Sequence, residues 1–181
     1  MKYTIRMKTS LSEEIESLLN DQVKMEGKSS SIYLAMAAYS DQLGFENSSE
    51  FFFTQSEEER QHMLKIFRYI ADSGGSPISP DITEVLQEFG SFRGVFESAL
   101  EQEIAVTKAI NKILSAAYQE GDHATANFLQ WFVREQQEEE FTARKRIELF
   151  DVIGEEGIGR YMIDQKIPEI APPEAEIDLN S

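Results

Sequence analysis

Carboxylate side chains and one histidine occupy positions where the helical period of this sequence calls for apolar residues. Glu59 and His62 are three residues apart, which places both on one face of a helix. Glu26, Glu103 and Glu139 each fall on the apolar stripe of a different segment. Because an ionised carboxylate buried without a counter-charge costs several kcal/mol, these four stripes need bound cations or protons.

Bound metal is the simplest partner for such a set. Lys and Arg are almost absent from the four stripes, and the exception, Arg146, lies about two helical turns beyond Glu139. The chain has no cysteine, so thiolate ligands are excluded. Carboxylates with one imidazole favour iron or manganese, with zinc as a further possibility.

Long helical segments must hold these residues. All 5 prolines lie between residues 77 and 80 or beyond residue 167, which leaves long stretches without helix breakers. The apolar period predicts helices at about 12–40, 48–73, 91–120 and 122–151, followed by a shorter helix at 155–166. We expect one domain over residues 1–167 and an acidic, proline-rich tail over residues 168–181.

The expected helix ends carry their own signals. Ser10 and Glu13 have the spacing of a capping box ahead of the first helix. Ser91 and Asp122 can cap the third and fourth helices, and Gly121 can end the third.

Connection lengths predict the topology. Only a few residues join the first helix to the second, and fewer still join the third to the fourth, so each pair is expected to be antiparallel. The segment 74–90 could span roughly 56 Å if extended, whereas the second helix is about 40 Å long. The segment can therefore run back along the bundle and make the second and third helices parallel.

Composition excludes several classes of function. The formal net charge of −16 repels phosphate backbones, so we expect no nucleic-acid partner. No apolar stretch is long enough to span a membrane, and residues 1–10 lack the apolar run of a signal peptide. We therefore expect a cytoplasmic protein.

From about residue 11 to residue 167 the sequence resembles the bacterial, non-haem ferritins. The most specific passages are EEERQHM at 57–63 and NFLQWFVREQQEEE at 127–140. The resemblance implies an all-α, ferritin-like four-helix bundle with one long crossover and a short fifth C-terminal helix.

The resemblance also implies a ferroxidase centre. Two of its positions would bind iron, the first through Glu26, Glu59 and His62, with Glu59 bridging, and the second through Glu103 and Glu139. Gln136 would stand close to both irons, and Tyr33 beside the centre. A third iron position would draw on four carboxylates, those of Glu58, Glu135, Glu138 and Glu139.

Departures from neighbouring families narrow the expectation. Bacterioferritins bind haem through a methionine that follows the bridging glutamate, and Arg60 stands at that position here, so no haem is expected. Those proteins repeat Glu-x-x-His on the last long helix, where this chain has Gln136 and Glu139. The resulting asymmetric site fits a centre that passes iron onward.

The resemblance implies a hollow shell of 24 subunits that oxidises Fe(II) with O2 or H2O2 and stores ferric mineral. In the run 51–53, three phenylalanines point around more than half a helix, so we expect one ring to meet another subunit. Two alternatives stay open at this point. One is a di-iron enzyme acting on an organic substrate, and the other is a metal-free helical interaction module.

Overall fold

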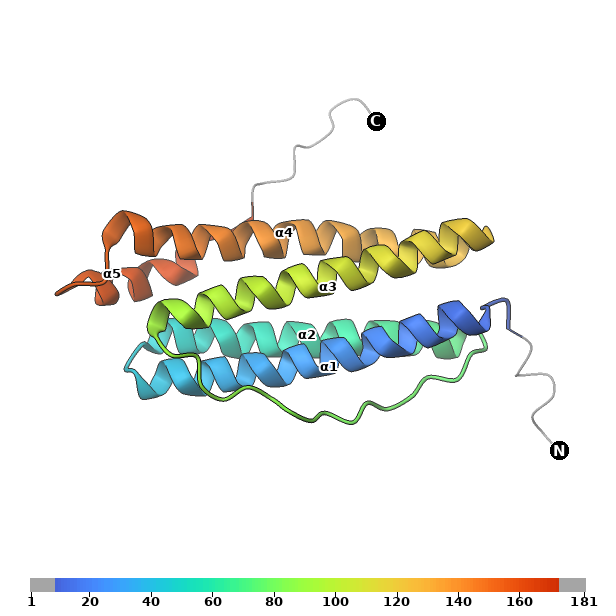
Figure 1. Ribbon diagram of the computed structural model, residues 1–181, viewed down its shortest axis with the longest axis horizontal. Coiled ribbons are helices and arrows are strands. Elements are labelled where there is room, and N and C mark those ends of the chain that lie inside the picture. Colours follow the sequence, from blue (N-terminus) through green and yellow to red (C-terminus); the bar gives the residue numbers. More distant parts are fainter. Residues whose placement is uncertain (1–8, 173–181) are drawn as a thin grey trace, which may run out of the picture.

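The computed structural model describes residues 9–172, and the regular structure within that range is entirely helical. Four long helices lie side by side (Figure 1), namely α1 (Glu13–Gln42), α2 (Glu46–Asp72), α3 (Phe92–Glu120) and α4 (His123–Ile153). The short helix α5 (Gly159–Lys166) and a turn of 3-10 helix (Ile167–Glu169) follow. The predicted four-helix bundle with a short fifth helix is confirmed.

The crossover between α2 and α3 sets the topology. It runs along the outside of α1 to the opposite end of the bundle, so α2 and α3 are parallel, as predicted (Figure 1). Gly27 on α1 permits this close approach. A Cβ atom at Gly27 would lie 3.0 Å from Cδ1 of Ile82 in the crossover and 3.1 Å from Sδ of Met63 on α2.

The start of α1 corrects one prediction. Ser12, not Ser10, caps the helix, because its Oγ accepts the N–H of Ile15 at 3.1 Å. The preceding residues are held outside the helix by Thr9, whose Oγ1 donates to the carbonyl of Ser73 at 2.7 Å and accepts from the N–H of Leu11 at 3.0 Å.

Three other predicted helix ends are confirmed. Ser91 accepts the N–H of Gly94 at 2.9 Å, and Asp122 accepts that of Thr125 at 3.0 Å. Gly121 ends α3 with φ of 72°, a left-handed conformation that favours glycine.

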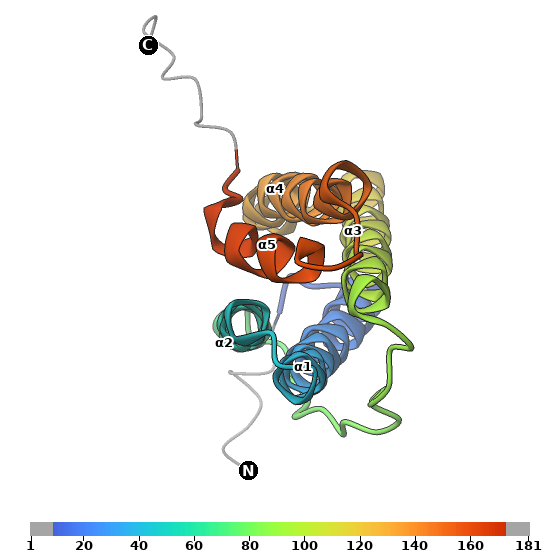
Figure 2. The ribbon, with the colours of Figure 1, turned by 90° about the vertical axis from the view of Figure 1, so that its left-hand side faces the viewer.

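The starts of α2 and α5 differ from the prediction. Helix α2 begins at Glu46 rather than near residue 48, because Asp164 of α5 accepts hydrogen bonds from the Asn47 and Ser48 backbone and so caps the helix from outside. Helix α5 begins at Gly159 rather than near residue 155, and Gly157 in the turn before it has φ of 58°. Helix α5 thus lies across one end of the bundle (Figure 2).

The core consists of two apolar clusters, one in each half of the bundle. The first contains Ile15, Leu19, Ile66, Val106 and Phe132, among others. The second includes Tyr33, Phe52, Phe96, Ala99 and Phe150. On every long helix the carboxylate predicted to bind metal falls between the segments that enter the two clusters.

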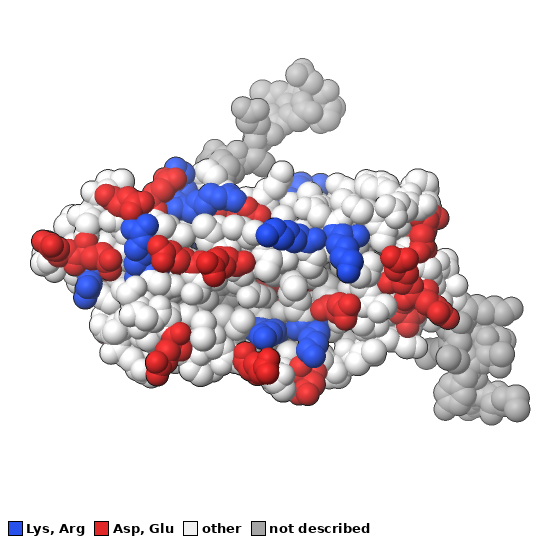
Figure 3. Space-filling model, in the orientation of Figure 1, with Lys and Arg blue, Asp and Glu red and all other residues white. Residues whose placement is uncertain are grey.

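The described part of the chain carries no helix long and apolar enough to cross a membrane. On the face drawn in Figure 3, acidic and basic side chains are scattered among uncharged ones, and no broad basic patch is visible there. The predicted tail begins at residue 168, inside the 3-10 turn at Ile167–Glu169, and residues 173–181 lie outside the described range.

Candidate metal centre

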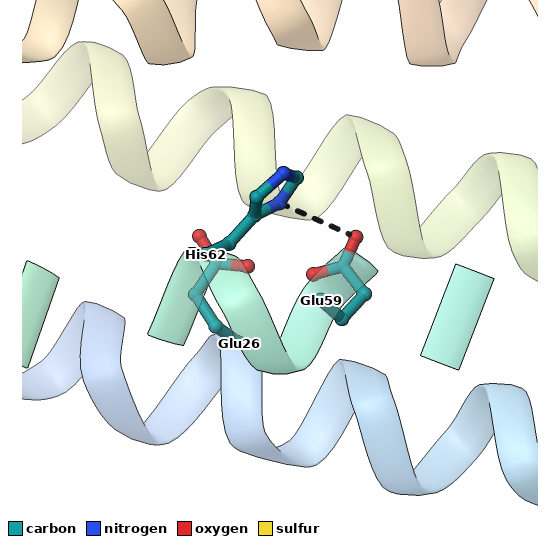
Figure 4. A group of neighbouring side chains, drawn as sticks. All are labelled: Glu26, Glu59 and His62. Carbon is teal, nitrogen blue, oxygen red and sulfur yellow. Dashed lines mark ion pairs between the residues drawn. The ribbon is translucent and has the colours of Figure 1, made fainter. Parts of the chain in front are cut away.

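Glu26, Glu59 and His62 come together between α1 and α2 (Figure 4). One ligand atom from each lies within 4.8 Å of the others. All three side chains are buried, with Glu26 fully inaccessible. The i, i+3 spacing on α2 turns Glu59 and His62 toward Glu26 of the neighbouring helix, as the sequence predicts.

Two carboxylate oxygens in this group have no hydrogen-bond partner. Gln22 donates to Oε1 of Glu26 at 2.8 Å, whereas Oε2 of Glu26 and Oε2 of Glu59 are buried and receive no N–H or hydroxyl donor from residues 9–172. The two carboxyls lie close enough to share a proton, which raises the pKa of Glu59 and lowers that of Glu26 against the larger effect of burial. Burial raises the pKa of both carboxyls, that of Glu59 well above its ordinary value. Buried, unpaired oxygens from two helices are the donors that a divalent cation requires, so the group fits a metal ion.

His62 is prepared to act as a neutral ligand. Burial, with a smaller effect from the charge of Lys65, lowers the pKa of His62 to about 4. Its Nδ1 lies 3.8 Å from Oε1 of Glu59, a distance too long for a hydrogen bond. The imidazole is therefore uncharged near neutral pH and forms no ion pair. One of its ring nitrogens then has a lone pair that can bind metal, which the protonated form lacks.

Glu103 lies in a separate hydrogen-bond network. Its carboxylate accepts from the hydroxyl of Tyr33 and, at 3.2 Å, from Nε2 of Gln136. Thr107 in turn donates to Oε1 of Gln136 at 3.1 Å. Burial raises the pKa of Glu103 to about 7, although both hydrogen bonds oppose the shift. Burial and then the charge of Glu103 also raise the pKa of Tyr33 far above its ordinary value.

Glu139 completes the set of four carboxylates, one from each long helix. It is partly buried, and burial followed by the charge of Glu103 raises its pKa to about 8. The charges of Glu103 and Glu139 also raise the pKa of Glu59. Glu103 and Glu139 are not members of the group formed by Glu26, Glu59 and His62, but they are close enough to interact electrostatically with it.

The carboxylates predicted for a third iron line an open groove between α2 and α4. Its volume is about 300 Å³, and its walls include Glu58, Glu135, Glu138 and Glu139 together with Arg146. Burial raises the pKa of Glu58 and that of Glu135. Gln55, a further wall residue, donates a hydrogen bond to Glu58.

Two supporting residues were not identified from the sequence. Gln22 lies one turn before Glu26 and contacts it, a relation that the i, i+4 spacing on α1 could have revealed. Thr107 lies one turn after Glu103, but it acts through Gln136 of α4, and no local pattern indicates that contact.

Comparison with known proteins gives one consistent answer. The family model described as "Ferritin-like domain" matches residues 16–153. A "Probable bacterial non-heme ferritin-like protein" of Haemophilus influenzae is 37% identical, over 89% of this chain and 98% of its own length. A "Bacterial non-heme ferritin" of Campylobacter jejuni is 34% identical, over 89% of this chain and 96% of its own.

Solved structures agree with the sequence relatives. The open pore ferritin of the archaeon Archaeoglobus fulgidus superposes with a TM-score of 0.84 at 37% identity, covering 87% of this chain and 98% of the other. A structure titled "Humanized Archaeal ferritin" superposes equally well, with the same TM-score and identity. The bundle, its buried carboxylates and these relatives lead to one conclusion: this chain belongs to the ferritin family.

Proposed function

We propose that this protein oxidises Fe(II) at a di-iron carboxylate centre and stores the ferric product as mineral inside a hollow shell of 24 copies. The observation that carries the proposal is the pair of unpartnered, buried oxygens of Glu26 and Glu59 beside a neutral His62. Relatives named as non-heme ferritins support iron as the metal and a role in its storage. Iron in this proposal is the substrate and the cargo.

The proposal gives each buried group a role. Glu26 and His62 would hold the first Fe(II), and Glu59, whose Oε2 is unpartnered, would bridge to the second. Glu103 and Glu139 would bind the second Fe(II) from the opposite pair of helices. Gln136 would orient Glu103 through its hydrogen bond.

The chemistry balances with O2 or H2O2 as the oxidant. Each Fe(II) gives up one electron, and a pair of them reduces O2 to H2O2 or H2O2 to water. Water supplies the oxygen atoms of the ferric oxyhydroxide product and releases protons to solution. The protein's part is to hold the ions close together and to stabilise the higher ferric charge with carboxylates.

Tyr33 and the acidic groove would serve the same centre. Tyr33 donates to Glu103 and so fixes the orientation of one proposed ligand. Glu58, Glu135, Glu138 and Glu139 would hold a third iron as it leaves the centre, because their groove adjoins it through Glu139.

A direct test is the number of iron atoms retained per subunit. Fe(II) is added stepwise under air, and the dissolved fraction is sized and assayed for iron. Storage predicts a count far above the roughly two ions that one dinuclear site can hold. A plateau at two would contradict storage and would direct attention to the groove of about 580 Å³ beside His62 as a place for an organic substrate.

A further inference from the structure

Arg146 on α4 is a buried guanidinium that forms no ion pair with any residue in the described range 9–172. The residue is 7% exposed, and its Nε has no hydrogen-bond partner in the part of the chain that the structure describes. Its described contacts are the ring of Phe51, 3.9 Å from the guanidinium carbon, and the carbonyl of Ile170, which accepts from Nη2 at 3.3 Å. Such a group is costly to bury and has donors to spare.

The position of Arg146 indicates what it could bind. It lines the same groove as the carboxylates of Glu58, Glu135, Glu138 and Glu139, and the last described residue, Pro172, also lines that groove. The charge of Arg146 acts on both Glu58 and Glu139, although neither forms an ion pair with it. The groove therefore holds four carboxylates suited to a cation and one guanidinium suited to an anion.

Binding of metal would change the electrostatic balance between Arg146 and the carboxylates of this groove. Without metal, the nearby carboxylates compensate the charge of Arg146 at a distance. Once a cation binds those carboxylates, they compensate Arg146 less, and the carbonyl of Ile170 is its hydrogen-bond acceptor among residues 9–172. An anion placed between the cation and the guanidinium would then be attracted by both.

We propose that Arg146 and a metal ion held by the groove carboxylates together bind a small oxyanion, inorganic phosphate. The tetrahedral anion has enough oxygens to contact a hard cation on one side and the guanidinium on the other. Phosphate binding is accordingly metal-dependent. This inference rests on the proposed metal binding but adds a ligand that iron storage alone does not require.

Carboxylates of the chain itself are a second kind of oxyanion that Arg146 could bind. Glu174, Glu176 and Asp178 follow shortly after Pro172, and their carboxylates are also oxyanions. The test therefore compares the wild-type chain with a full-length variant in which these residues become Gln, Gln and Asn.

The experiment is equilibrium dialysis of radiolabelled phosphate against metal-free and zinc-loaded protein, with bound zinc measured in every sample. Zinc replaces iron because it does not change oxidation state. Zinc-loaded wild-type protein should bind about one more phosphate per subunit than metal-free protein. If the wild-type protein bound no zinc, both this inference and the proposed centre would be overturned. If it bound zinc but no phosphate, this inference alone would be overturned.

Three substitutions locate the site. Arg146→Gln should weaken phosphate binding roughly tenfold or more, the worth of a charge-assisted hydrogen bond. Arg146→Lys keeps the charge and loses the paired donors, so it should restore part of the affinity and covers the case in which the Gln variant does not fold. The matched control is Arg144→Gln on the same helix, whose exposed side chain pairs with Glu140 and whose loss should have no effect.

Several outcomes would overturn the proposal. Equal phosphate binding by metal-free and zinc-loaded protein would remove the metal dependence, and undiminished binding by Arg146→Gln would remove the residue. If phosphate bound only after the three acidic residues at 174–178 were neutralised, the chain's own carboxylates would be the anion that Arg146 holds.

Discussion

At the scale of single residues, the buried carboxylates work against the stability of the metal-free fold. Glu26 and Glu59 are excluded from water, and each has an oxygen without a partner. Burial of this kind favours the protonated form and costs free energy whenever the group is ionised. The same oxygens become favourable ligands when a cation is present. The arrangement therefore lowers the stability of the metal-free fold and raises its affinity for metal.

Glu59→Gln should separate these two effects. The amide removes an ionisable group from the core. At pH 8 the metal-free variant should therefore be more stable than the wild type, by about 1 kcal/mol or more in free energy of unfolding. Its thermal midpoint should no longer rise when zinc is added, because the proposed bridging ligand is gone. Melts with chelator and with zinc measure both effects.

The control for that substitution is Glu57→Gln on the same helix. Glu57 is exposed, and its described hydrogen bond is the one it accepts from Gln61. This variant should keep the full response to zinc. A zinc-induced rise that survives in Glu59→Gln would show that Glu59 is not a ligand.

The pH dependence of metal-free stability has a definite sign. Glu103 and Glu139 have pKa values of about 7 and about 8, above the ordinary 4.5, so the folded chain retains protons that the unfolded chain has released. Their stabilising contribution is complete below about pH 4.5 and is lost as the pH rises through 7 and 8. His62, with a pKa lowered to about 4, acts in the opposite direction as the pH falls below about 6.5.

Chelator-treated protein should therefore lose stability as the pH rises from about 5 toward 9, by a few kcal/mol in all, because two carboxyls release protons over this range and His62 opposes them only below about pH 6.5. Zinc-loaded protein should lose much less, because the metal replaces the protons that the carboxylates would otherwise release. Denaturant unfolding at a series of pH values, with and without zinc, measures the difference. Identical pH profiles for the two forms would contradict a metal site at these carboxylates.

Sequence patterns predicted which residues face the core, and that was sufficient to place Glu26, Glu59, His62 and Glu103 among the buried side chains. Each lies on an apolar stripe whose period is fixed by its own helix. The unpaired state of Arg146 and the link from Thr107 to Gln136 depend on how α3, α4 and the chain after α5 pack together. The spacing of apolar residues along a single helix carries no information on contacts between helices.

At the scale of elements, the carboxylate of Asp164 connects the short helix α5 to the start of α2. Asp164 of α5 is buried and accepts from the backbone N–H of Ser48 at 2.8 Å, from its hydroxyl at 2.7 Å and from the side chain of Asn47 at 2.8 Å. Phe45, which precedes α2, offers no side-chain cap of its own. Helix α5 therefore supplies the missing N-terminal cap of α2.

This cap also shows where sequence reasoning stops. The caps formed by Ser91 and Asp122 lie next to the helices they serve and were predicted correctly. Asp164 lies 116 residues from Ser48, and no local motif connects them. The start of α2 was consequently misplaced, although the helix itself was predicted.

Asp164→Ala should destabilise the fold by about 2 kcal/mol or more, because it leaves the buried N–H and hydroxyl of Ser48 without an acceptor. Urea unfolding of the metal-free protein measures the loss. Glu169→Ala is the comparison, since Glu169 is exposed and pairs only with Lys166 among the described residues, and its removal should cost at most about 1 kcal/mol. Equal losses in the two variants would contradict the capping role.

At the scale of the whole molecule, residues 9–172 leave several large apolar side chains exposed on the bundle. Phe53 on α2 is 50% exposed and Leu34 on α1 is 47% exposed, and both line a groove of about 500 Å³ on the α1–α2 side. Phe52 and Phe51, by contrast, pack against the core of their own chain. The ring expected to meet another subunit is therefore Phe53.

Phe53→Glu should disrupt assembly while leaving the metal centre in place. All proposed ligands come from one chain, so a dissociated subunit should still bind zinc and oxidise Fe(II), yet it should retain only the two or three ions, roughly, of its own centre and groove. Light scattering after size exclusion should show wild-type particles near 500 kDa, the mass of 24 copies of a 20.7 kDa chain, and smaller species for the variant. Gln61→Glu adds the same charge at an exposed position of α2 and should leave both particle size and iron content unchanged. High iron retention by dissociated subunits would contradict storage in a shell, because a mineral needs an enclosed space that one bundle does not provide.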